Sequence, residues 1–128
     1  MRSYLLDASA LLAFIHGEPG SARVRELIRA GTAGMTVINA AEVVSKLASK
    51  GVPAAVAEQD CRDLGMELIE IDEGLAFAAA ALVPATKPLG LSLGDRICLA
   101  AASRDGSVAV TADKVWAQVP GVAVEVIR

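Results

Sequence analysis

Short apolar runs alternate along the chain with longer segments in which apolar residues recur at helical spacing. The apolar runs predict strands at residues 3–6, 35–38, 67–71, 108–111 and 122–127. The segments between them predict helices at residues 8–15, 21–30, 39–51, 53–64, 73–83, 92–104 and 113–118, with a loop over 84–91. Because strands and helices alternate and the strands hold few polar positions, the pattern predicts an α/β fold with a parallel sheet covered by helices on both faces.

The helix expected at residues 73–83 differs from the others because it is apolar nearly all round. A helix of this kind is either fully buried or part of an interface. Aromatic residues make up only 3% of the chain, so few large side chains are available to cover it. The segment therefore indicates more apolar surface than a small monomer buries.

The size and composition favour one soluble domain. The chain has 128 residues, and we expect a single domain over residues 1–128. With 54% hydrophobic and 21% charged residues it is not a disordered chain. The longest uncharged apolar stretch, residues 75–83, is well short of the roughly 20 residues that a membrane helix needs. Asp7 interrupts the first apolar run, which argues against a signal peptide, so we expect a cytoplasmic protein.

Four of the fifteen acidic residues fall where a predicted strand meets the following helix, or in the first turn of a helix. They are Asp7, Glu42, Asp95 and Asp113. In open parallel sheets the carboxyl ends of the strands line the ligand crevice. We therefore expect these four carboxylates to converge although they are distant in sequence.

Each acid also has a purely local interpretation as a helix cap. Asp7 and Asp113 are suitable N-caps, and the spacings Asn39 to Glu42 and Ser92 to Asp95 resemble capping boxes. Capping alone does not explain why nearby positions also hold short polar side chains, namely those of Ser9, Asn39, Ser92 and Thr111. Buried carboxylates without cations are costly, so a cluster of four implies a metal ion or shared protons.

The available ligand types favour a hard cation. Oxygen-only ligands suit Mg²⁺ or Mn²⁺. His16 is the only histidine, and it is more typical of a helix end than of a ligand. Cys61 and Cys98 form no CxxC or CxxH pair, so we expect two reduced thiols and no zinc ribbon. Carboxylates with Mg²⁺ are suited to phosphoryl chemistry, in which the metal activates water.

The overall charge does not by itself favour a nucleic-acid enzyme. The net charge is −3 and the isoelectric point is about 5.1, whereas nucleic-acid binding is normally driven by basic surfaces. A metal-binding cluster of acids contributes negative charge that a bound cation would offset. The acidic balance is therefore a weak argument against such an enzyme.

Several segments in order along the chain resemble the PIN-domain family, and within it the VapC-like toxins of prokaryotic toxin–antitoxin pairs. The matching segments are LDASALLA at 6–13, EPG at 18–20, NAAEV at 39–43, GLSLGDR at 90–96 and TADKVW at 111–116. The resemblance covers essentially the whole chain. It implies a parallel five-stranded sheet flanked by helices, and endonucleolytic cleavage of RNA with Mg²⁺ or Mn²⁺, leaving a 5′-phosphate and a 3′-hydroxyl.

The resemblance also assigns roles to residues and partners. It implies that Asp7, Glu42, Asp95 and Asp113 are the catalytic acids that hold the metal. Accessory hydroxyl groups are expected from Ser9 and Thr111. Some family members carry a further acid shortly after the position of Asp113; none of the four residues that follow it here is acidic, which leaves open whether one or two metal ions bind. A homodimer and a small antitoxin that covers or enters the active site are the implied partners.

The basic residues and the tryptophan have two interpretations each. Arg96, next to Asp95, either contacts an RNA phosphate or pairs with an acid. Five further basic side chains either contact phosphates or belong to a solvated face, which we favour: Arg23, Arg25, Arg29, Lys46 and Lys50. Trp116 is expected to be a packing anchor, since stacking on bases would require it to be exposed.

Two other functional classes explain fewer of these residues. An aspartyl-phosphate phosphatase needs a second Asp two residues after the first, and Ser9 stands there. A non-catalytic regulatory or binding α/β domain with an acid pocket is the other alternative, with Asp72 as phospho-acceptor and Lys114 as its lysine. That interpretation leaves Glu42 and Asp95 without a role.

Overall fold

A computed structural model of the chain describes residues 3–128, so Met1 and Arg2, which begin the expected domain, lie outside the described residues. Its strands are β1 (Tyr4–Leu6), β2 (Ala33–Thr36), β3 (Glu67–Ile69), β4 (Val108–Thr111) and β5 (Val124–Val126). They form one five-stranded sheet in the order β3-β2-β1-β4-β5, and every neighbouring pair is parallel. The predicted α/β class with a five-stranded parallel sheet is confirmed.

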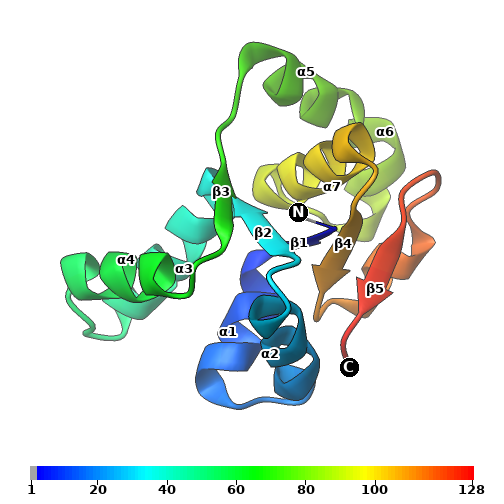
Figure 1. Cartoon of the computed structure of the whole chain (residues 1–128). Helices are drawn as coiled ribbons and strands as arrows, with labels where there is room; N and C mark the ends of the chain where they lie inside the picture. The colour runs from blue at the N-terminus through cyan, green and yellow to red at the C-terminus, as the bar shows by residue number, and fades with distance from the viewer. Residues whose placement is uncertain (1–2) are drawn as a thin grey trace.

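Helices cover both faces of this sheet (Figure 1). The α-helices are α1 (Ala8–His16), α2 (Ser21–Arg29), α3 (Val37–Ser49), α4 (Ala54–Asp63), α5 (Glu73–Ala81), α6 (Val83–Thr86) and α7 (Leu93–Asp105). Two short 3-10 helices are η1 (Lys87–Leu89) and η2 (Lys114–Gln118). The pair α3 and α4 extends to one side of the sheet, while α5 and α6 lie beyond α7 on another side.

The core has two parts because successive strand residues point to opposite faces of the sheet. Leu5 of β1 and Ala109 of β4 pack with the buried side of α7 and with α5. Their neighbours Leu6 and Val110 pack with α1, α2 and α3 on the other face. The central strands are therefore buried on both sides, which explains their nearly unbroken apolar sequence.

One predicted boundary, between β2 and α3, was wrong by two residues. Strand β2 ends at Thr36, and the apolar, β-branched residues Val37 and Ile38 form the first turn of α3 instead of the end of the strand. The N-cap of α3 is Thr36, whose side chain accepts a hydrogen bond from the backbone N–H of Asn39. Asn39 is therefore not the cap, and Glu42 lies in the second turn of the helix.

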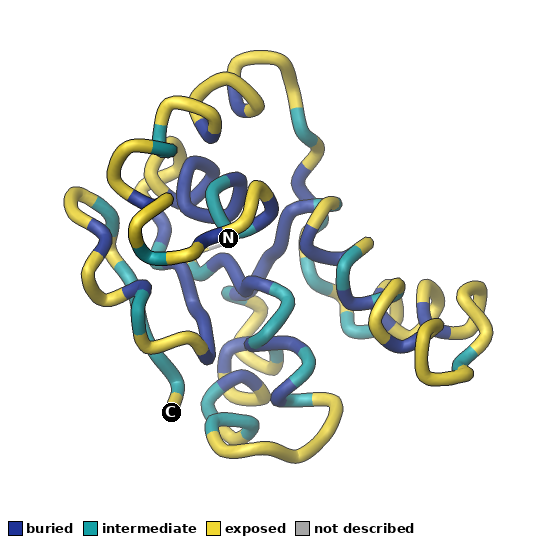
Figure 2. The backbone as a smooth tube through the Cα atoms, turned by 180° about the vertical axis from the view of Figure 1, so that it is seen from behind, coloured by how far each residue is buried: buried dark blue, intermediate teal, exposed yellow. Residues whose placement is uncertain are grey.

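The segment after β3 also differs from the prediction. The predicted loop at 84–91 contains α6 and η1, and the apolar helix ends at Ala81. Helix α5 is not fully buried: only Leu75 and Ala79 of its nine residues are buried, and the Phe77 side chain is 70% exposed. Figure 2 shows that much of this helix lies at the surface. Of the two alternatives for this helix, full burial is excluded, and the interface stays a prediction.

Both cysteines lie in the hydrophobic core. Cys61 and Cys98 are both free and buried. Within residues 3–128, no helix has the length and apolar character needed to cross a membrane.

Candidate active site

The four predicted acids line one pocket at the carboxyl edge of the central strands. Its volume is about 320 Å³, and it is lined by Asp7, Ala8, Ser9, Leu12, Glu42, Lys46, Asp95, Asp113 and Trp116. Asp7 follows β1, Asp113 follows β4, and Glu42 and Asp95 come from α3 and α7. The structure thus brings together residues that are up to 106 positions apart in the chain, as the parallel sheet predicts.

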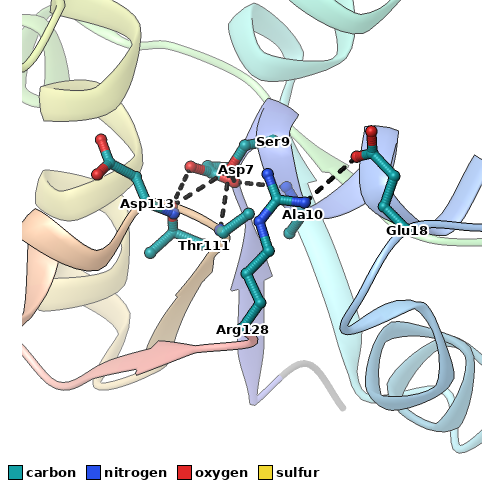
Figure 3. A network of polar contacts seen from close by, with 8 residues as sticks. Asp7, Ser9, Ala10, Glu18, Thr111, Asp113 and Arg128 are labelled. Atoms are coloured by element: carbon teal, nitrogen blue, oxygen red, sulfur yellow. Dashed lines mark hydrogen bonds and ion pairs between the residues drawn. The ribbon is translucent and has the colours of Figure 1, made fainter. Parts of the chain in front are cut away.

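Asp7 is the most constrained of the four acids. Its side chain is only 3% exposed. Oδ1 accepts hydrogen bonds from the Ser9 hydroxyl (2.7 Å) and from the backbone N–H of Ala10 (2.8 Å), and Oδ2 accepts one from the Thr111 hydroxyl (2.6 Å). Figure 3 shows this network joining the start of α1 to the end of β4. Asp7 is therefore both the N-cap of α1 and a carboxylate of the pocket.

Burial raises the pKa of Asp7 from 3.8 to about 6. The hydrogen bonds from Thr111, Ala10 and Ser9 oppose this change by stabilising the ionised form, and the negative charge of Asp95 adds to it. A cation next to this carboxylate would favour ionisation and restore a lower pKa. The protonation state of Asp7 is thus coupled to whatever positive charge occupies the pocket.

Ser9 and Thr111 contact Asp7, and they also hold the backbone that follows β4. The Ser9 hydroxyl oxygen accepts a hydrogen bond from the backbone N–H of Ala112 (2.9 Å), and Thr111 Oγ1 accepts one from the N–H of Asp113 (3.0 Å). These bonds fix the segment that carries Asp113 relative to Asp7 (Figure 3). Both hydroxyl groups therefore contact the Asp7 carboxylate and the backbone next to Asp113, and their expected accessory role stays a prediction.

Glu42 is held between α3 and α7. The side-chain amide of Asn39 donates to Glu42 Oε1 (2.7 Å) and, more weakly, to the backbone carbonyl of Gly94 (3.3 Å). A Cβ atom added at Gly94 would lie 2.6 Å from Glu42 Oε2, so only glycine leaves room for the carboxylate there. In the sequence, Gly94 was noted only as part of the segment at 90–96 and without a role, and Asn39 was interpreted as a cap although its amide is buried.

Asp95 and Asp113 sit at helix starts that also explain them locally. Asp95 and Ser92 form a capping box: the Ser92 hydroxyl accepts from the N–H of Asp95 (3.2 Å), and Asp95 Oδ2 accepts from the N–H of Ser92 (2.8 Å). Asp113 caps η2 through a hydrogen bond from the N–H of Val115 (3.2 Å). These two acids are therefore helix caps and also line the pocket. In each of them the capping hydrogen bond uses one carboxylate oxygen and leaves the other one for a ligand.

The buried thiol of Cys98 lies within electrostatic range of three of the four acids. Cys98, on the inner face of α7, has a pKa raised well above 9.0, first by burial and then by the negative charges of Asp7, Asp95 and Glu42. Three of the four carboxylates thus act on one buried atom. The negative potential beneath the pocket is of the sign that attracts a cation.

The donor set fits a hard cation, although its geometry is open. All four acids offer carboxylate oxygen, the preferred ligand of Mg²⁺ and Mn²⁺. In the part of the chain that the structure describes, no three His, Cys, Asp or Glu side chains lie close enough to hold a metal ion as they stand. Asp113 is exposed and is the most able of the three to rotate toward the fixed carboxylate of Asp7, whereas Glu42 and Asp95 are half-buried and each is held by a hydrogen bond.

The other predicted contacts are placed as follows. Arg96 donates from Nη1 to the backbone carbonyl of Leu91 (2.9 Å), and its buried Nε has no hydrogen-bond partner among the described residues. Lys46 lines the acid pocket, whereas Arg23 pairs with Glu125 (2.7 Å). Trp116 is only 1% exposed and packs in the core, so it is a packing anchor as predicted.

Comparisons with known proteins agree with this fold. A model of the PIN domain family matches residues 4–122. The comparison with curated protein sequences gave no significant match.

Solved structures of toxin–antitoxin complexes share the architecture. The chain is similar to VapBC2 from Rickettsia felis bound to a DNA fragment from their promoter, with a TM-score of 0.73 and 19% identity over 95% of this chain and 96% of that chain. It is also similar to a toxin–antitoxin complex from Klebsiella pneumoniae, with a TM-score of 0.73 and 24% identity over 98% of each chain. DNA-bound VapBC from Salmonella typhimurium gives a TM-score of 0.73 and 16% identity over 100% of each chain.

These low identities establish a shared fold and no more. The family model is more specific, because its match spans residues 4–122 and includes all four acids of the pocket. The chain belongs to the PIN-domain family.

Proposed function

We propose that the protein is a Mg²⁺- or Mn²⁺-dependent endoribonuclease that acts as the toxin of a toxin–antitoxin pair. The observation that carries this proposal is the convergence of Asp7, Glu42, Asp95 and Asp113 on one pocket at the carboxyl edge of the sheet. Carboxylates on that edge, without histidine, are suited to metal-assisted phosphodiester hydrolysis. The similarity to toxin–antitoxin complexes adds support for the biological setting.

The acids of the pocket are held by different contacts. Asp7 presents its carboxylate from a rigid frame of Ser9 and Thr111, so it is the anchor of the proposed metal site. Asp95 is the second main ligand, fixed by its capping box. Glu42 and Asp113 complete the site or hold water molecules at its edge. A cation held by these carboxylates would supply an activated water for in-line attack and would stabilise negative charge on the phosphate.

Basic side chains around the pocket are suited to holding the RNA backbone. Lys46 lies in the second half of α3, on the wall of the pocket that also carries Glu42. Its ammonium group neutralises a phosphate that approaches the acids. Arg96 extends from the helix that carries Asp95, and we assign it the same role.

The activity is tested by incubating the purified protein with end-labelled single-stranded RNA in MgCl₂ or MnCl₂. We expect cleavage products with 5′-phosphates, and no cleavage in EDTA. Asp7→Asn and Asp95→Asn should each lower the rate by at least about 100-fold, because the amide keeps the volume and removes the charge that holds the cation. Asp60→Asn, an exposed acid of α4 outside the pocket, is the control. Near-full activity of the Asp95→Asn protein would overturn the assignment.

The partners follow from the same proposal. A small antitoxin should bind the protein and block the acid pocket, for example by pairing an Arg side chain with the carboxylates. A homodimer is proposed through the exposed apolar surface of α5. Both partners are expected in the cytoplasm. Co-expression with the product of the adjacent gene, followed by affinity purification, should recover a stable complex that no longer cleaves RNA.

A further inference from the structure

The Glu42 side chain is held from two sides by groups that belong to different elements. We propose that Asn39 and Gly94 are positioning residues that place the Glu42 carboxylate against the first turn of α7, beside Asp95. The inference rests on the proposed function insofar as Glu42 is a ligand residue. The Glu42 carboxylate would then be fixed by a neutral amide and not by a positively charged side chain.

Asn39 is a buried amide whose orientation is set by its own neighbour. It is 0% exposed. The Thr36 hydroxyl donates to Asn39 Oδ1 (2.8 Å), which makes Oδ1 the acceptor and directs the NH₂ group toward Glu42. The amide then donates to Glu42 Oε1 (2.7 Å) and to the Gly94 carbonyl (3.3 Å). Asn39 thereby connects the Glu42 carboxylate to the helix that carries Asp95.

Gly94 provides the space that the carboxylate occupies. A Cβ added there would lie 2.6 Å from Glu42 Oε2 and 2.8 Å from its Cδ, closer than real Cβ contacts. No positive φ forces glycine at this position, since Gly94 is not among the glycines with left-handed backbone. The requirement for glycine is therefore the close approach of Glu42. Since the obstructing atoms belong to the end of a flexible side chain, alanine at this position would move Glu42 and leave α7 intact.

The second helical position of α5 offers a matched control. Gly74 and Gly94 are each the second residue of a helix with a side-chain N-cap, Asp72 and Ser92 respectively. A Cβ at Gly74 would meet only Asp72 Oδ1 at 3.5 Å, an ordinary contact. Gly74→Ala and Gly94→Ala therefore make the same backbone change, and they differ in whether a pocket carboxylate is displaced.

The first experiment measures Mn²⁺ affinity of the intact protein by electron paramagnetic resonance, together with thermal unfolding without metal. Gly94→Ala should weaken Mn²⁺ binding by about 10–100-fold, as is typical when the support of a metal ligand is removed. Its melting temperature should not fall, because alanine is a better helix former than glycine. Gly74→Ala should keep the Mn²⁺ affinity of the parent. Equal affinities for the parent and Gly94→Ala would overturn the role of Gly94.

The second experiment separates positioning from a general structural role for Asn39. Asn39→Ala should weaken Mn²⁺ binding in the parent but have little effect in a Glu42→Gln background, where the supported carboxylate is already absent. A merely structural role predicts the same loss in both backgrounds. Thr86→Val is the control for losing a buried polar side chain, and it should keep the Mn²⁺ affinity of the parent. Thr86 is also 0% exposed, and it donates to the Leu82 carbonyl outside the pocket.

A readout without metal distinguishes failure of this inference from failure of the proposed function. In the metal-free parent, we expect a nuclear Overhauser effect between the γ protons of Glu42 and the α protons of Gly94. Asn39→Ala should abolish it, with the other contacts of α3 retained. If the parent binds no Mn²⁺, the proposed function fails, and this comparison alone decides the positioning role. Persistence of the effect in Asn39→Ala would overturn that role whatever the activity.

Discussion

The carboxylate of Asp7 is subject to two opposing influences, burial and hydrogen bonding, and burial is the stronger. Its folded-state pKa of about 6 lies above the ordinary value of 3.8, so the folded protein binds this proton more tightly than the unfolded chain does. The stabilising contribution of Asp7 is therefore complete below about pH 4 and is lost as the pH rises through 6. The gap between the two values corresponds to about 3 kcal/mol at neutral pH.

Replacing Asp7 with asparagine tests this balance. At pH 7 and without metal, Asp7→Asn should be about 1–2 kcal/mol more stable than the parent, because the buried charge is removed while one hydrogen bond, from Thr111, is lost. At pH 4 the advantage should disappear. Urea unfolding of both proteins at a series of pH values measures the difference. An advantage that does not change between pH 4 and 7 would contradict the raised pKa.

Divalent cations should make the parent more stable than Asp7→Asn, the reverse of the order expected without metal. A cation that binds only the folded state raises its stability in proportion to the logarithm of its concentration. Millimolar Mn²⁺ at pH 7 should therefore raise the melting temperature of the parent by several degrees, and that of Asp7→Asn much less. Scanning calorimetry with and without Mn²⁺ provides the measurement. Equal responses in the two proteins would exclude Asp7 as a ligand.

The positions of the acids could be predicted from the sequence, but their individual environments could not. Asp7 and Asp113 each lie between an apolar strand and the following helix. The Asp7 carboxylate is buried and accepts hydrogen bonds from the Ser9 and Thr111 hydroxyl groups, whereas Asp113 is exposed. That difference arises from packing between segments about one hundred residues apart, which no local pattern contains.

Helix α7 supplies Asp95 to the pocket and Gly94 next to the Glu42 carboxylate, so its N-terminal cap supports the site. Ser92→Ala removes the hydroxyl that accepts from the N–H of Asp95 and should cost about 1 kcal/mol of stability. Without that bond the carboxylate of Asp95 is less well fixed, and RNA cleavage should fall more than the loss of stability explains. Urea unfolding and cleavage rates are compared with those of Ser49→Ala, an exposed serine at the C-terminal end of α3. Unchanged unfolding of Ser92→Ala would show that the cap contributes nothing.

The elements could be predicted where the apolar pattern had a single interpretation. Strand β4 was predicted at its observed bounds, Val108–Thr111, because polar residues and a glycine turn delimit it. Strand β2 was displaced because Val37 and Ile38 have strand-like side chains, while the cap at Thr36 starts a helix there. The hydrogen bond from the Asn39 side chain to the Gly94 carbonyl of α7 adds a tertiary contact that the apolar pattern does not contain.

In the molecule as a whole, the acid pocket and the exposed apolar surface of α5 are formed by different elements. The pocket lies at the ends of β1 and β4 with α3 and α7, whereas α5 contributes none of its lining. Helix α5 packs on α7 through Leu75 and Ala79 and leaves the rest of its surface uncovered (Figures 1 and 2). The proposed antitoxin site and the proposed dimer surface are therefore on different elements.

The exposed surface of α5 is the predicted interface of a homodimer. Phe77 is 70% exposed, and the neighbouring exposed residues Ala76, Ala78, Ala80 and Ala81 add no charge. We expect the protein to dimerise in light scattering at high concentration through this surface. Phe77→Asp should weaken dimerisation by roughly thirtyfold, since losing a large aromatic anchor costs about 2 kcal/mol. Val56→Asp makes the same change in charge at another exposed apolar side chain, on α4, and should leave the dimer intact. A parent protein that stays monomeric at every concentration, or a dimer that Phe77→Asp does not weaken, would exclude α5 as the interface.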